Sequence, residues 1–90
     1  MNKKYKRSFI KDINKIGQKD IRKKLEAFIL QVESASSVED LPHTIKMKGT
    51  INAYRTRIGN YRIGFFYDKT TNELLFVRFV KRNDIYKLFP

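Results

Sequence analysis

Residues 53–66 read AYRTRIGNYRIGFF, and this stretch decides most of the expected fold. Gly59-Asn60 is a two-residue hairpin signal between two runs that are rich in β-branched and aromatic side chains. A similar run follows after the polar turn 69–72. The expected strands are 51–58, 61–68 and 73–80. The C-terminal half of the chain therefore predicts an antiparallel meander.

The hairpin turn also predicts which side chains share a face. With Ile58 opposite Tyr61, Arg57 pairs with Arg62 across the two strands. Side chains alternate across a sheet, so Arg55 lies on the same face as this pair, opposite Gly64, which we expect to leave open space. The other face suits packing under helices and carries Tyr54, Thr56, Ile58, Tyr61, Ile63 and Phe65. Like charges that face each other destabilise a sheet, so either a bound polyanion or simple solvation must accommodate the arginines.

The N-terminal half predicts two antiparallel helices. Phe9, Ile13 and Ile16 recur at helical spacing, with Ser8 as the expected N-cap and Gly17 as the end of the helix. A second apolar stripe follows at Ile21, Leu25, Phe28, Ile29 and Val32. In the connector that follows, either Ser36 with Glu39 or Ser37 with Asp40 is expected to cap a single turn. The expected fold class is therefore α+β, a helical hairpin packed on a small antiparallel sheet.

The composition of the chain narrows the range of possible functions. The chain has 90 residues, and 20 Lys and Arg against 9 Asp and Glu give a net charge of +11, which favours a polyanionic partner. Cysteine is absent, which excludes disulfides and thiol catalysis. The few carboxylates are scattered, so neither a metal site nor a cofactor is expected. No stretch resembles a membrane span or a signal peptide, and we expect a single cytoplasmic domain over residues 1–90.

Arg55, Arg57 and Arg62 form an arginine patch, which is the expected binding site for a polyanion. Further basic residues extend this expected site. Arg82 ends the third strand, and Tyr86 lies one helical turn later, where it either acts on a bound nucleotide or packs in the fold. Residues 84–89 are expected to form a short helix or an extended end. His43 is interpreted as a surface loop residue, and the face of Arg78 stays open. The expected contacts to RNA outside the arginine patch are Lys46, Lys48, Lys81, Lys19, Arg22, Lys23 and Lys24.

Two motifs resemble a known family across nearly the whole chain. The first is KMKG at 46–49 followed by AYRTRIGNYRI at 53–63, and the second is FVKRNDIY at 79–86. Both are similar to the toxin subunits of the RelE/ParE superfamily of type II toxin–antitoxin systems. The resemblance implies a short first strand over Lys3 to Arg7, then two helices and an antiparallel sheet.

RelE-type members are ribosome-dependent endoribonucleases, so the resemblance implies a metal-free attack of a ribose 2′-OH on the adjacent phosphate of mRNA. Residue by residue, it implies that Arg57 and Arg62 stabilise the phosphorane and that Arg82 aids departure of the 5′-oxygen. Arg55 corresponds to the other member of the basic pair on the second strand. Tyr86 would orient or deprotonate the 2′-OH, although a cation on the second strand remains the alternative base. Lys81 departs from the pattern, because many relatives have histidine there.

The resemblance also implies partners and leaves competing functions open. The implied partners are an acidic antitoxin, in a hetero-oligomer with the toxin, and the ribosome with its mRNA. ParE-type members share the fold but poison DNA gyrase, and a non-catalytic RNA-binding module is the third possibility. The joint presence of Arg62, Arg82 and Tyr86 favours the nuclease.

Overall fold

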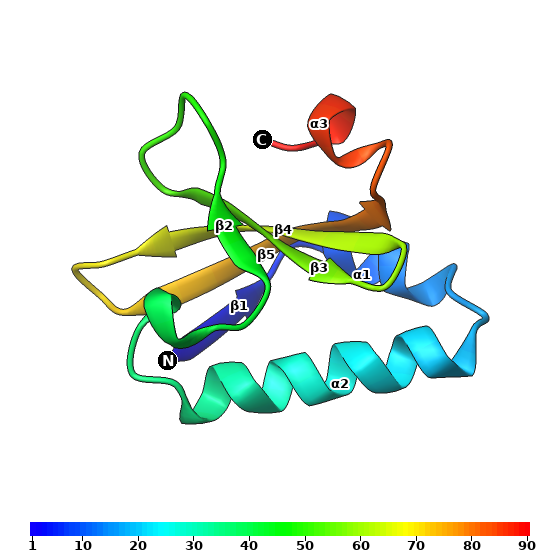
Figure 1. Cartoon of the computed structure of the whole chain (residues 1–90), viewed down its shortest axis with the longest axis horizontal. Helices are drawn as coiled ribbons and strands as arrows, with labels where there is room; N and C mark the ends of the chain where they lie inside the picture. Colours follow the sequence, from blue (N-terminus) through cyan, green and yellow to red (C-terminus); the bar gives the residue numbers. More distant parts are fainter.

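A computed structural model describes all 90 residues as three α-helices on a five-stranded sheet. The strands are β1 (Asn2–Tyr5), β2 (Thr44–Lys46), β3 (Ala53–Ile58), β4 (Tyr61–Asp68) and β5 (Glu73–Lys81). The helices are α1 (Arg7–Asn14), α2 (Lys19–Ser34) and α3 (Ile85–Leu88), with a 3-10 turn at Val38–Asp40. The long α2 runs along one face of the sheet and α3 lies over the opposite face (Figure 1). The predicted α+β class is confirmed, and none of the helices combines the length and apolarity that crossing a bilayer requires.

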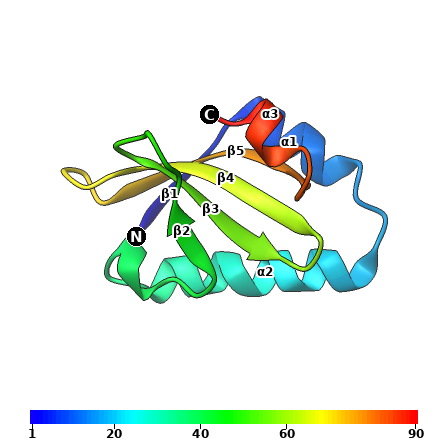
Figure 2. The ribbon, with the colours of Figure 1, turned by 45° about the horizontal axis from the view of Figure 1, so that its top comes forward.

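The sheet has the order β1-β5-β4-β3-β2, and its strands fan out with a twist (Figure 2). The three predicted central strands are present, and β3 and β4 pair as the hairpin signal predicted, with Ile58 opposite Tyr61. The sheet is mixed, because β1 pairs with β5 in parallel. The short edge strand β2 was not predicted. It has only three residues, too few for an alternating pattern to be recognised in the sequence.

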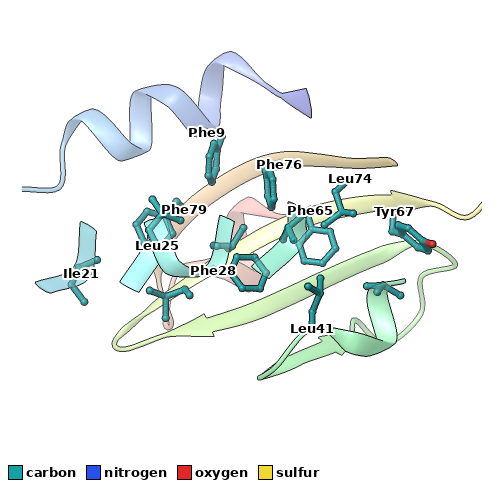
Figure 3. Packing of buried hydrophobic residues seen from close by; sticks show 14 of the residues in the cluster. Phe9, Ile21, Leu25, Phe28, Leu41, Phe65, Tyr67, Leu74, Phe76 and Phe79 are labelled. Carbon is teal, nitrogen blue, oxygen red and sulfur yellow. The ribbon is translucent and has the colours of Figure 1, made fainter. Parts of the chain in front are cut away.

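Aromatic rings fill the core between the sheet and the helices α1 and α2 (Figure 3). Phe9 of α1 stacks on Phe76 of β5 with ring centroids 5.3 Å apart. Buried residues of α2 join the same core, at the spacing that the sequence predicted: Ile21, Leu25, Phe28 and Val32. Burying the apolar face of α2 contributes about 1.5–3 kcal/mol for each large side chain. This packing fixes α1 and α2 on one face, and the C-terminal segment with α3 packs on the other face of β3 and β4.

The first helix departs from the prediction at both ends. It begins at Arg7, with Lys6 as the N-cap, because the chain turns into the helix directly after β1. Ser8 is therefore not the cap, and its hydroxyl donates to the carbonyl of Val77 at 2.6 Å. The helix ends at Asn14, three residues before Gly17. The predicted capping box of the connector is confirmed for Ser37 with Asp40.

The structure shows which face of the sheet Arg78 occupies, a point that the sequence left open. Its guanidinium donates to both carboxylate oxygens of Asp12, at 2.8 and 3.1 Å. One of these oxygens also accepts the backbone N–H of Phe79 at 2.9 Å. Asp12 is only 6% exposed, so the ion pair links α1 to β5 inside the fold. Arg78 therefore holds the structure together and lies outside the arginine patch.

Replacing Asp12 by alanine is expected to lower the free energy of unfolding by about 2–3 kcal/mol, because it leaves a half-buried guanidinium and a buried N–H without their acceptor. Alanine favours a helix, so helix propensity does not contribute to this loss. Urea denaturation measures the effect. The matched control is Glu26→Ala, which removes an exposed carboxylate from α2. An equal loss in both variants would show that net charge, and not the ion pair, sets the stability.

Candidate functional site

The β3–β4 hairpin places three arginines on the face of the sheet that turns away from α1 and α2. Arg57 pairs with Arg62, and Arg55 pairs with Gly64. On the other face Thr56, Ile58, Ile63 and Phe65 are buried beneath the helices. The predicted register and the predicted division between the two faces are confirmed. Local sequence is enough to set both, because a two-residue turn fixes the register and the alternation of side chains fixes the face.

A second, smaller core holds α3 over this arginine-bearing face. Ile85 and Phe89 are buried together with Met47 and Ala53. The ring of Phe89 lies directly over Gly64, so that a Cβ at position 64 would be 2.5 Å from its Cδ2 atom. The expectation that Gly64 leaves open space is therefore wrong, since Phe89 occupies that space. The glycine instead permits close approach of the C-terminal segment, and this contact positions the helix that carries Tyr86.

Three arginines and one tyrosine meet in a shallow pocket between this helix and the hairpin. The pocket encloses about 310 Å³. It is lined by Arg55 of β3, Arg62 of β4, Arg82 and Asn83 after β5, and Tyr86 of α3. The guanidinium of Arg55 lies 5.5 Å from the centre of the Tyr86 ring, at the distance of a cation–π contact. Tyr86 is itself 63% exposed, so it is accessible to a ligand.

The charges in this pocket are poorly compensated within the chain. Desolvation by burial lowers the pKa of Arg62, and the nearby charges of Arg55, Arg57 and Arg82 lower it further. The only hydrogen bonds from the Arg62 side chain go to the backbone carbonyls of Gly59 and Tyr61, at 3.0 and 2.9 Å. The Nε–H of Arg55 is buried and has no acceptor. A bound anion would offset the repulsion among these guanidinium groups.

Arg57 shares the arginine face but does not line this pocket. Its Nη2 lies 3.1 Å from Nδ1 of His43, and its backbone N–H donates to the His43 carbonyl at 3.0 Å. The structure thus brings four of the five predicted catalytic residues together and places the fifth beside them. His43 is exposed, as expected of a loop residue, but its contact with Arg57 was not predicted. Nothing in the spacing of the sequence indicated it.

The other predicted RNA contacts fall into three groups. Lys81 lines a depression of about 390 Å³ that adjoins the pocket through Arg82 and Asn83. Lys46 and Lys48 are exposed on and after β2, and Lys19, Lys23 and Lys24 are exposed on α2. Arg22 differs from these lysines. Its guanidinium donates to the carbonyls of Ile16 and Ile13, at 2.7 and 3.1 Å, and so holds the C-terminal end of α1 against α2.

Comparison with known proteins finds toxins of toxin–antitoxin systems that are similar in sequence and in structure. Residues 4–86 match the family described as the ParE toxin of the type II toxin–antitoxin system parDE. The toxin RelE3 of Methanocaldococcus jannaschii is 37% identical over 87 residues, which cover 96% of each chain. A chain in the crystal structure of the RelB-RelE antitoxin–toxin complex from Methanococcus jannaschii superposes with a TM-score of 0.80 at 31% identity. That match covers 97% of this chain and 99% of the other. The intact E. coli RelBE complex contains the same fold, with a TM-score of 0.70 at 16% identity over 89% and 94% of the two chains.

Proposed function

Because the chain belongs to the RelE/ParE superfamily of toxins of type II toxin–antitoxin systems, we propose that it is an endoribonuclease that cuts mRNA on the ribosome. The observation that carries the proposal is the pocket in which Arg55, Arg62, Arg82 and Tyr86 meet. Gyrase inhibition by binding alone does not require such a set. Cleavage of a phosphodiester does, because negative charge develops on the phosphorus oxygens and on the departing oxygen.

The proposed reaction is an intramolecular transfer. The 2′-oxygen of a ribose loses its proton and forms a bond to the adjacent phosphorus, and the bond from phosphorus to the 5′-oxygen breaks. The departing 5′-oxygen takes up a proton from solvent, so that a 2′,3′-cyclic phosphate and a 5′-OH result. Arg62 is half-buried and close to other cations, so water screens its attraction to a phosphorane less than it would for an exposed arginine. Arg57 is proposed to add charge from the same face. Arg82 is proposed to stabilise the departing 5′-oxygen.

Tyr86 is proposed to act on the 2′-OH. Its ring contacts Arg55 and its exposed position allows the hydroxyl to reach a substrate in the pocket. Tyr86 either takes the proton of the 2′-OH as a phenolate or orients that group for attack through its hydroxyl. Arg55 is proposed to hold the tyrosine through the cation–π contact and to bind the phosphate through the terminal N–H groups of its guanidinium. The proposed site thus uses guanidinium groups for charge stabilisation and a phenol for the proton.

The net charge of +11 supports a target made of RNA. A protein that enters a cavity lined by ribosomal phosphates gains from many weak contacts between cations and phosphates. Lys46, Lys48, Lys81, Lys19, Lys23 and Lys24 are exposed and are proposed to provide these contacts. Cytoplasmic localisation is proposed on the same basis, because translating ribosomes are there. The direct test is toeprinting of a translated mRNA with the purified protein, where cleavage must require the ribosome.

A second candidate function is inhibition of DNA gyrase, which the match to the ParE description favours. Replacing Tyr86 by phenylalanine discriminates between the two. The change keeps the ring on Arg55 and removes only the hydroxyl, so cleavage of ribosome-bound mRNA is expected to fall by about 10²–10⁴-fold. A gyrase inhibitor would keep its toxicity. Growth arrest on expression and mRNA toeprinting of the same variant therefore give opposite results under the two functions.

We also propose that the chain binds an antitoxin, as the RelE chains of the similar complexes do. A partner that covers the arginine face must supply carboxylates, since unpaired guanidinium groups are costly to bury. The partner segment is therefore expected to be acidic and amphipathic, in a hetero-oligomer with this chain. Association is expected to be fast at low ionic strength and to weaken as salt is added.

A further inference from the structure

A second depression lies between α2 and β3, outside the pocket in which cleavage is proposed, and of the residues given a role in that reaction it includes Arg57 alone. It encloses about 420 Å³. Its lining residues are Lys24, Ala27, Phe28, Gln31, Pro42, His43, Arg57, Ile58 and Gly59. None of them is acidic. Phe28 and Ile58, both buried, give it an apolar floor, and the three basic side chains come from α2, the connector and β3.

His43 fixes the position of Arg57 in this depression. The guanidinium of arginine can only donate, so Nδ1 of His43 is the acceptor in their 3.1 Å contact. The imidazole is then the tautomer with its proton on Nε2, which leaves Nε2–H as a further donor. The backbone of His43 is also constrained, with φ at 55°, and its carbonyl accepts the N–H of Arg57. The side chain and the backbone of His43 thus both bind Arg57.

Lys24 completes the cluster from the helix. Its Nζ lies 3.8 Å from the place that a Cβ on Gly59 would occupy, so the ammonium reaches the tip of the β3–β4 hairpin. Arg57 is paired across the hairpin with Arg62, which lines the catalytic pocket. A basic rim over an apolar floor suits one nucleotide unit, with the phosphate at the rim and the ribose or base on the floor.

We propose that Lys24, His43 and Arg57 form a phosphate-binding subsite for the RNA backbone, separate from the pocket in which cleavage is proposed. His43 acts in it as a positioning residue, because it holds the guanidinium of Arg57. The subsite rests on the proposed function only in that its ligand is RNA. The phosphates can come from the message or from ribosomal RNA, and the experiment distinguishes these sources.

The first test measures binding of the full chain to a short fluorescein-labelled 2′-O-methyl RNA by fluorescence anisotropy over a range of salt concentrations. This RNA has no free 2′-OH and cannot be cut, so the result is independent of catalysis. Lys24→Gln is expected to weaken binding about threefold to fivefold and to reduce the salt slope by about 0.7–1. The matched control is Lys69→Gln, which removes one charge in the β4–β5 turn at the other end of the sheet. It is expected to change the affinity by less than about twofold.

The second test isolates the role of the His43 side chain. Asparagine and glycine both tolerate a positive φ, but only asparagine offers a side-chain acceptor near the position of Nδ1. His43→Asn is therefore expected to bind RNA within about twofold of the unchanged protein, and His43→Gly about threefold more weakly. Circular dichroism melting of both variants shows whether folding is preserved. Equal affinity of the two variants would overturn the positioning role.

The third test repeats the Lys24→Gln measurement with vacant ribosomes and with ribosomes that carry an mRNA. Weaker binding to both assigns the phosphate to ribosomal RNA, and weaker binding only in the presence of mRNA assigns it to the message. If the protein cuts no mRNA but the oligonucleotide results hold, the proposed function fails and the subsite stands. Equal losses for Lys24→Gln and Lys69→Gln in the oligonucleotide assay would overturn the subsite, because net charge alone would then explain both.

Discussion

Replacing Arg62 by alanine will reduce ribosome-dependent cleavage of mRNA by about 10²–10³-fold, the cost of removing one preorganised donor from a site that stabilises developing negative charge. Arg62 is half-buried, and desolvation and the nearby charges of Arg55, Arg57 and Arg82 lower its pKa. Its interaction with a phosphorane is therefore less screened by water than that of an exposed arginine. Single-turnover cleavage on programmed ribosomes measures the effect.

Stability separates this catalytic role from a structural one. Arg62→Ala removes two hydrogen bonds to the carbonyls of Gly59 and Tyr61 but also relieves repulsion among the arginines. We expect the free energy of unfolding to change by less than about 1 kcal/mol. Arg62→Lys keeps the charge but loses the planar fork, and is expected to recover only part of the activity. Full activity of Arg62→Ala would refute the proposed nuclease site.

Replacing Gly64 by alanine will reduce cleavage by about 10-fold or more through displacement of Tyr86, although residue 64 itself bears no chemical group. The new Cβ would lie 2.5 Å from the ring of Phe89, which is closer than atoms can approach, so the C-terminal segment must move. A shift of about 1 Å in a positioned group is enough for a large loss of rate. The accompanying loss of stability is expected to be about 1–3 kcal/mol, as for overpacking elsewhere.

A double variant tests this explanation. Phe89→Leu shortens the side chain over position 64, so Gly64→Ala combined with Phe89→Leu is expected to be more active than Gly64→Ala alone. The two effects should therefore be non-additive, as for residues in contact. Gly17→Ala is the matched control, since a Cβ there meets nothing within 4 Å. Additive losses in the double variant would show that the contact with Phe89 does not position Tyr86.

Much of the site could be predicted from the sequence because it depends on local rules. The turn at Gly59-Asn60 sets the pairing of Arg57 with Arg62, and alternation puts Arg55 on their face. The helical spacing of Arg82 and Tyr86 indicated that they lie close together, and both line the pocket. The prediction for Gly64 failed because it considered only the two strands. A residue 25 positions further along the chain fills the space over that glycine.

The amino-acid order alone therefore determined the α+β class, the hairpin register and the shared face of the arginines, since turn type and residue alternation act over a few neighbouring positions. Only the tertiary structure decided that Phe89 covers Gly64, that Asp12 binds Arg78 and that His43 holds Arg57. These contacts join segments that are distant in the chain. Their geometry follows from the packing of whole helices on the sheet, which no local pattern encodes.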